Sequence, residues 1–220
     1  MTQKNTVETV MKYVLLVSAL TSIMIVLMIG IFTLKEGMPA FREIGLGDLL
    51  TKTTWRPGQE QFGILAMIVG SSLVTVGAVV IGVPLALGSA IFLAEIAPRR
   101  VKAFVKPSIE LLAGIPSVVY GLFGMVVLVP LVRKIPAPGN SGYGLLAAAI
   151  VLAVMILPTI ASVSENAIRN VPKSFREGSL AMGATRWETI RKVVLPSARS
   201  GILSAVVLGL GRALGGTIAM

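Results

Sequence analysis

The sequence contains no cysteine and no histidine. It can therefore form no disulfide, no Cys/His zinc site, no thiol nucleophile and no histidine-dependent catalytic triad. Charged residues are also scarce, at 14% of the 220 residues, compared with about 25% in a typical soluble domain. We expect no catalytic residue, no metal site and no cofactor in this chain.

Apolar residues take the place of the missing groups, at 55% of the chain. They gather in five blocks: residues 13–34, 62–94, 104–132, 143–162 and 201–220. At about 1.5 Å per helical residue, each block is long enough to cross a bilayer core of about 30 Å. The sequence therefore predicts an all-α fold, a polytopic transmembrane helical bundle with five spans in the lipid bilayer.

Prolines and flanking charges refine this picture. The first block is followed directly by Lys35 and Glu36 and has no small-residue cleavage site, which predicts an uncleaved anchor. The second is too long for one straight crossing and contains Pro84, so we expect a span with a bent or interfacial end. Pro116 and its neighbours predict a broken third span; residues 114–117 either bend it toward a transport path or reflect the glycine and proline common in membrane helices.

The basic residues that give the net charge of +10 are unevenly distributed among the predicted loops. One side of the predicted topology holds the N-terminus, residues 95–106 and residues 164–199, and the positive-inside rule makes it cytoplasmic. The basic charge therefore needs no nucleic acid to explain it, and the C-terminal end of the fifth span is predicted to lie outside. Thirteen of the 20 lysines and arginines lie on the cytoplasmic side: Lys4, Lys12, Arg99, Arg100, Lys102, Lys106, Arg169, Lys173, Arg176, Arg186, Arg191, Lys192 and Arg199.

The cytoplasmic stretch 164–199 predicts two short helices around a turn. Ser174 and Glu177 have the spacing of a capping box, and Glu188 precedes Lys192 by four residues, as in a helical ion pair. Gly183 lies between these two pairs of residues and is expected to break the helix. Such a segment either lies on anionic lipid or displays a compact knob to the cytoplasm.

The spacing of this stretch is similar to the EAA loop of ABC-importer permeases. Glu177 is followed six residues later by Gly183 and then by Val193-x-Leu195-Pro196, although Gly178 and Ser179 replace the usual alanines. The resemblance implies docking to a dimer of cytoplasmic ATP-binding subunits, and the chain itself has no G-x-x-x-x-G-K-[ST] phosphate loop. The expected coupling residues are Glu177, Met182, Gly183, Ala184, Arg186 and Trp187.

Further segments resemble phosphate importer permeases of the PstC type, which have the MetI-like fold of binding-protein-dependent transport components. These are IFLAEIAPRR, ELLAGIPSVVYGLFG, ILPTIAS and GLGRALG. The resemblance implies a bacterial inner-membrane protein that works with a second homologous permease and a soluble phosphate-binding protein. It also implies six spans, of which five are present. Residues 1–62 would form a cytoplasmic tail, first span and external loop, and residues 63–220 the permease core.

Arg212 is the single charged residue within the fifth block, past the middle of the membrane. An intramembrane cation needs protein, water or an anion around it, and a guanidinium matches phosphate oxygens well. We therefore expect Arg212 to contact the substrate; the alternative is that it pairs with Glu110 or a backbone carbonyl, or snorkels outward. The family usually has a glutamate four residues later, where this chain has Gly216.

The sequence also allows alternative substrates and an alternative function. Glu95 and Glu110 each have a base four residues away, Arg99 and Lys106 respectively, which predicts interfacial ion pairs. One arginine does not choose among tetrahedral anions, so molybdate or sulfate is an alternative substrate. A membrane scaffold that docks a partner and moves no solute is a third possibility.

Overall fold

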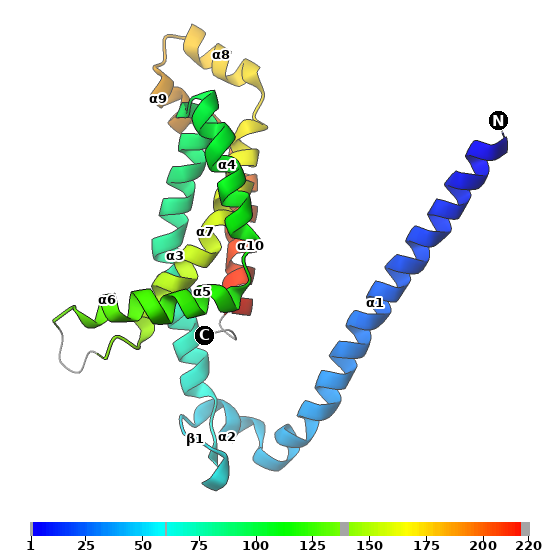
Figure 1. The fold of residues 1–220 in the computed structure, drawn as a ribbon, viewed down its shortest axis with the longest axis vertical. Helices are drawn as coiled ribbons and strands as arrows, with labels where there is room; N and C mark the ends of the chain where they lie inside the picture. Colours follow the sequence, from blue (N-terminus) through cyan, green and yellow to red (C-terminus); the bar gives the residue numbers. More distant parts are fainter. Residues whose placement is uncertain (1, 60, 137–140, 217–220) are drawn as a thin grey trace. The chain divides into compact units, whose positions relative to one another are not determined.

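The structure is a computed structural model that describes residues 2–59, 61–136 and 141–216. The chain divides into two compact units, Met1–Met67 and Ile68–Met220 (Figure 1).

The first unit is mainly one long helix, α1 (Thr2–Ile44). Its large apolar side chains between residues 10 and 34 are exposed on every side, which suits a helix surrounded by lipid or by other spans. The predicted first span is thus confirmed as a helix long and apolar enough to cross a membrane. The rest of this unit contains α2 (Leu46–Thr51), the 3₁₀ turn η1 (Pro57–Gln59) and the antiparallel strands β1 (Trp55–Arg56) and β2 (Gln61–Phe62).

The second predicted span is α3 (Leu65–Ile91), which continues into the π-helical turn η2 (Phe92–Ile96). Helix runs on through Pro84, so the bent end expected from this proline is replaced by a wider last turn. Proline is tolerated within membrane helices because neighbouring groups can satisfy the freed carbonyl.

The third block is broken, as its prolines predict. Helix α4 (Arg99–Ala113) ends at a three-residue break, and α5 (Ser117–Phe123), the π-turn η3 (Gly124–Leu128) and α6 (Val129–Arg133) follow at an angle of 98°. Pro116 causes the break, because its extended ψ of 141° and missing N–H cannot continue α4. The Tyr120 hydroxyl donates across the break to the Leu112 carbonyl at 2.8 Å.

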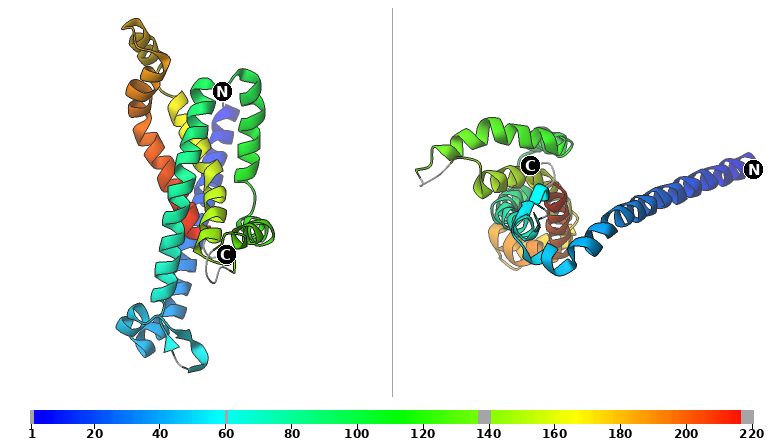
Figure 2. Two further views of the ribbon diagram at one scale, coloured as in Figure 1. Left: turned by 90° about the vertical axis from the view of Figure 1, so that its left-hand side faces the viewer. Right: turned by 90° about the horizontal axis from the view of Figure 1, so that it is seen from below.

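The remaining helices complete the second unit. They are α7 (Leu145–Arg169), α8 (Lys173–Ala181), α9 (Arg186–Thr189), the π-turn η4 (Ile190–Val194) and α10 (Leu195–Gly216). Helix α7 is the centre of the core, since Leu152, Ile156 and Ile160 are fully buried on it. Helices α3 and α10 pack along α7 (Figure 2).

Glycine contacts give the directions of these helices. On α3, Gly77 lies against Ala149 and Gly82 against Ala153, so α3 and α7 run parallel. On α10, Gly201 lies against Ala167, one turn from the end of α7. Helix α10 therefore runs back along α7 in the opposite direction.

The helix directions also bear on the path of the segment between α3 and α7. Four helices in the described residues are long and apolar enough to span a membrane, and the bent pair of α4 with α5–α6 is a fifth if it counts as one crossing. Because α3 and α7 are parallel, the segment between them must return from one end of the unit to the other. Counting the bent pair as one crossing gives the five predicted spans, and the long helices alone give four.

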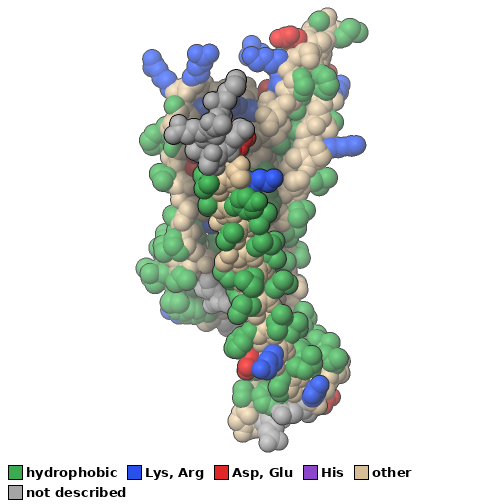
Figure 3. All heavy atoms as spheres, turned by 90° about the vertical axis from the view of Figure 1, so that its right-hand side faces the viewer, with side chains coloured by type: hydrophobic (Ala, Val, Ile, Leu, Met, Phe, Trp, Pro, Cys, Tyr) green, Lys and Arg blue, Asp and Glu red, His purple; other side chains and the backbone are tan. Residues whose placement is uncertain are grey.

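The same directions bring the α3–α4 connection and α8 to one end of the second unit. The basic residues of both segments meet there, as the positive-inside assignment requires. In Figure 3 apolar side chains cover the sides of the helices and lysine and arginine gather toward their ends.

Candidate anion site and coupling loop

Arg212 lies on α10 and joins three helices. Its Nη1 donates to Thr159 Oγ1 on α7 at 2.9 Å, and its Nη2 donates to the Ala113 carbonyl at the end of α4 at 2.7 Å. The last carbonyls of a helix have no partner within that helix, so the guanidinium satisfies one of them. A backbone carbonyl was one of the two alternative partners; the other, Glu110, is exposed on α4. A guanidinium has five N–H donors, so these two bonds to described residues leave donor capacity.

A hollow of about 360 Å³ lies beside Arg212. Its wall comes from the α4–α5 break, α7 and the end of α10, and among the described residues that line it Arg212 alone is charged. The lining residues are Ala113, Gly114, Ile115, Pro116, Ser117, Met155, Arg212, Gly215 and Gly216. A positively charged hollow with the Ser117 hydroxyl in its wall has the chemistry to receive a small anion.

Gly216, where the family resemblance led us to expect glutamate, is buried in this wall. A Cβ at this position would lie 2.3 Å from Met155 Cε and 3.4 Å from Leu152 Cδ1. The end of the methionine side chain therefore occupies the space next to Gly216 and would have to shift for any larger residue.

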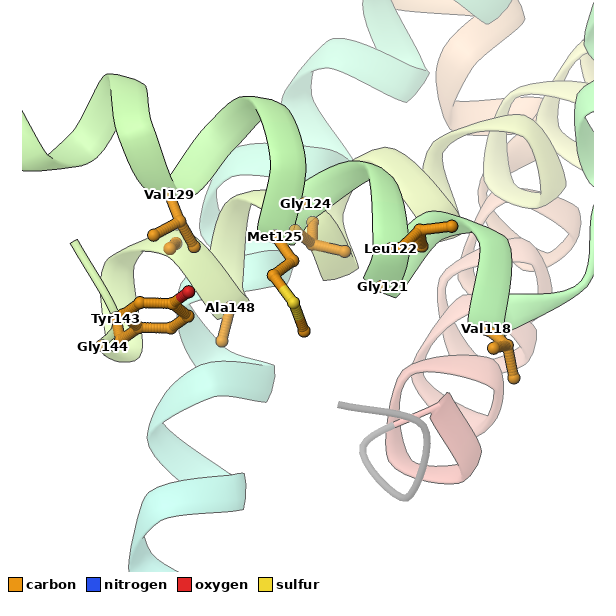
Figure 4. Close-up of a pocket in the computed structure, with 11 residues that line it drawn as sticks. Val118, Gly121, Leu122, Gly124, Met125, Val129, Tyr143, Gly144 and Ala148 are labelled. Atoms are coloured by element: carbon orange, nitrogen blue, oxygen red, sulfur yellow. The ribbon is translucent and has the colours of Figure 1, made fainter.

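A second hollow, of about 380 Å³, lies between α5–α6 and the start of α7 (Figure 4). Its lining includes Val118, Leu122, Met125 and Val129, with the Tyr143 side chain at one side and no charged residue. This composition favours apolar contact and offers nothing to an anion. The charged hollow at Arg212 is therefore the better candidate for the substrate.

The predicted coupling loop, residues 164–199, has the expected helix–turn–helix form, with Gly183 between α8 and α9. Helix α8 ends at Ala181, and Gly183 follows with φ +83°; its N–H donates to the Leu180 carbonyl at 3.0 Å. This left-handed conformation favours glycine because it has no Cβ. The Ser179 and Thr189 hydroxyls lie 2.9 Å apart and hold α8 against the end of α9.

Most of the predicted coupling residues near this turn are exposed. Met182 is 88% exposed and Trp187 is 58% exposed, values that are high for large apolar side chains. Glu177, Gly183 and Arg186 are also exposed, whereas Ala184 is half-buried. Exposed apolar and charged side chains together are typical of a surface that meets another protein.

The capping box lies elsewhere than predicted. Pro172, not Ser174, precedes α8, so Ser174 falls inside the first turn. The capping box is formed by Thr185 and Glu188 at the start of α9. The predicted ion pair between Glu188 and Lys192 is confirmed, at 3.3 Å.

The two other predicted ion pairs are wrong. Glu95 pairs with Arg176 of α8 at 2.7 Å, because extended backbone at Ala97 and Pro98 separates it from the helix of Arg99. Lys106 pairs with Glu165 at 2.7 Å.

Glu165 attracts Lys106 because it is buried on α7, and a buried carboxylate needs a cation more than the exposed Glu110 does. The ion pairs of Glu165 with Lys106 and of Arg176 with Glu95 could not be predicted from the sequence, because both join helices that are far apart in the chain.

Comparison with known proteins agrees with this architecture. Residues 78–220 match the family model of the binding-protein-dependent transport system inner membrane component. The chain is 47% identical over 196 residues to the probable ABC transporter permease protein YqgH of Bacillus subtilis, covering 87% of this chain and 63% of that protein. It is 43% identical over 193 residues to the phosphate transport system permease protein PstC of Haemophilus influenzae, covering 79% and 61%. A PstC protein of Mesorhizobium japonicum is 40% identical over 191 residues, covering 79% and 58%.

The chain thus spans about three fifths of the length of these curated relatives. The matched region begins on α3 and includes the Arg212 hollow and the coupling loop. The chain belongs to the family of binding-protein-dependent transport system inner membrane components.

Proposed function

We infer that this chain is a permease subunit of an ATP-driven importer for inorganic phosphate. The observation that carries this proposal is the hollow at Arg212, where the one charged residue of the described lining is a cation, in a chain similar to proteins named phosphate transport system permeases. Two permeases in the importer would share the translocation path, and a soluble phosphate-binding protein would deliver the anion from outside.

Phosphate would bind by competing for the guanidinium of Arg212. The present acceptors, the Ala113 carbonyl and the Thr159 hydroxyl, are both neutral. Hydrogen bonds to an ionised oxygen are roughly twice as strong as neutral ones, so a phosphate oxygen would displace the carbonyl. Releasing Ala113 would also free α10 from the α4–α5 break.

The energy would come from partner subunits. The exposed turn with Met182, Gly183 and Trp187 would enter a cleft of a cytoplasmic ATP-binding subunit, with Glu177, Ala184 and Arg186 at its margin. We place the N-terminus in the cytoplasm of a bacterial cell and the chain in the inner membrane. Residues 1–62 would provide the tail, first span and external loop, and residues 63–220 the permease core with its coupling loop at 164–199.

Reconstitution of this chain with a candidate partner permease, ATP-binding subunit and phosphate-binding protein tests the proposal. The expected result is ATP-dependent uptake of labelled phosphate. An excess of unlabelled phosphate should abolish this uptake, whereas the same excess of sulfate or molybdate should not. Uptake that prefers sulfate or molybdate would assign another oxyanion. An assembled complex that hydrolyses ATP and moves none of these anions would contradict the proposal in favour of a scaffold.

A further inference from the structure

Arg176 of α8 makes four hydrogen bonds within the second unit. Its Nε and Nη2 donate to Glu95 Oε1 at 3.2 and 2.7 Å. Its Nη2 also donates to the Ile168 carbonyl at 2.9 Å, and its Nη1 donates to the Val171 carbonyl. The Arg176 guanidinium, carried by α8, thus contacts η2, which continues α3, and the end of α7.

The contacts of Arg176 lie on a packed base. Ile168 and Val171 are buried in a small core with Ala90 of α3 and with Val194 and Ala198 of the following helices. The Arg176 and Glu95 side chains are only 20% and 14% exposed. Ion pairs with this little exposure resist screening better than exposed pairs do.

Helix α8 has few other attachments. None of its residues, all of which are described, is buried, and its apolar Phe175 and Leu180 are exposed. Among the described residues, the side-chain hydrogen bonds and ion pairs that hold it are those of Arg176 and the Ser179–Thr189 pair. The Ser179 contact leads to the helix that follows, so Arg176 is the link to the two preceding spans.

We propose that Arg176 is a positioning residue that carries movement of the coupling helix to α3 and α7. This inference rests on the proposed function, in which an ATP-binding subunit displaces α8. A guanidinium that is carried by α8 and bonded to η2 and to the end of α7 moves these elements together. Without the guanidinium, no side-chain hydrogen bond among the described residues joins α8 to the two preceding spans. Arg176 would not touch substrate; it would act through Glu95 and the carbonyls of α7.

Hydrogen exchange of the purified chain tests the positioning without any partner. We expect Arg176→Gln and Glu95→Gln to raise the exchange of α8 amides at least about tenfold, because α8 then opens from the unit independently. Arg176→Lys should fall between them and wild type, since an ammonium can pair with Glu95 but cannot form the same fork.

Lys106→Gln is the matched control, because it breaks a comparable ion pair, that with Glu165 between α4 and α7, without touching α8. The control should leave α8 exchange at the wild-type level. Unchanged α8 exchange in Arg176→Gln, or an equal rise in Lys106→Gln, would overturn the positioning role.

The assembled importer then tests transmission. With Arg176→Gln, we expect the ATP-binding subunit to co-purify and hydrolyse ATP, while stimulation of hydrolysis by phosphate-loaded binding protein falls at least about fivefold relative to wild type and to Lys106→Gln. Full stimulation would overturn the inference.

Stimulation also separates this inference from the proposed function. A wild-type complex that is stimulated by its binding protein but transports no phosphate would contradict the proposed substrate alone. The effect of Arg176→Gln on stimulation would still decide the role of Arg176.

Discussion

At the scale of single residues, Arg212 is held by acceptors that do not cancel its charge. Within the described residues it forms hydrogen bonds to Thr159 and Ala113 but no salt bridge. A cation at membrane depth without a carboxylate partner is costly and is usually retained for function. The intramembrane cation was evident from the sequence, whereas its partners 53 and 99 residues away were not.

Substitutions at Arg212 should separate charge from geometry. Arg212→Lys keeps the charge but loses the paired hydrogen bonds, so we expect phosphate uptake to fall by about tenfold; Arg212→Gln loses both and should lower uptake by about a hundredfold. Uptake is measured alongside complex yield, which reports folding. Normal assembly with wild-type uptake in Arg212→Gln would leave only the structural role of pinning the α4–α5 break.

Gly183 is a second residue whose conformation is specific. Its φ of +83° costs other residues about 1–2 kcal/mol, but apart from its two chain neighbours no atom of the described residues lies within 4 Å of an added Cβ. Any further effect of a side chain must therefore come from contact with a partner.

We expect Gly183→Asp to reduce co-purification of the ATP-binding subunit at least about tenfold while membrane insertion stays normal, because it places a charge in the docked surface. Gly183→Asn is the matched control, since asparagine tolerates the left-handed conformation and carries no charge. Equal retention of the subunit by wild type and Gly183→Asp would contradict docking through this turn.

At the scale of elements, the contact between α7 and α10 depends on small residues. A Cβ on Gly209 would lie 2.5 Å from Ile160 Cδ1, and Ile160 is fully buried and cannot move aside. Membrane helices gain stability from such close approach, because lipid supplies no hydrophobic drive between them.

We therefore expect Gly209→Val to lower the free energy of unfolding by about 1–3 kcal/mol through overpacking. Gly211→Val is its control on the same helix, since no atom of another described helix lies within 4 Å of a Cβ there. Unfolding in detergent with increasing denaturant compares the two. A similar loss in both variants would mean that the helix tolerates valine poorly in general and that the close contact is not responsible.

The broken α4–α5 element shows how local and tertiary effects divide. Pro116 alone predicts a break, because it has no N–H and restricts the residue before it. The 98° angle and the wall that the break contributes to the Arg212 hollow depend on packing against α7 and α10.

At the scale of the whole molecule, the absence of cysteine makes the topology directly testable. Single cysteines can be introduced at Arg100 and Ser141, which lie at opposite ends of the second unit. A membrane-impermeant maleimide added to intact cells should label Ser141→Cys and not Arg100→Cys. After the membrane is permeabilised, both should react.

Labelling of Arg100→Cys in intact cells would reverse the proposed orientation. Labelling of both variants from outside would contradict the single crossing by α4 and α5–α6.

The sequence by itself determined the membrane class, the position of the helices, the break at Pro116 and the lone cation at Arg212. These features depend on apolar length, proline chemistry and charge, which act locally along the chain. Tertiary structure decided the 98° bend between α4 and α5–α6 and the bonds of Arg212 to Ala113 and Thr159. It also decided that Glu95 pairs with the distant Arg176, and that Glu165 pairs with Lys106 as well as with Arg169 on its own helix. These outcomes depend on which helix faces lie together, because a carboxylate between packed helices attracts cations from neighbouring helices.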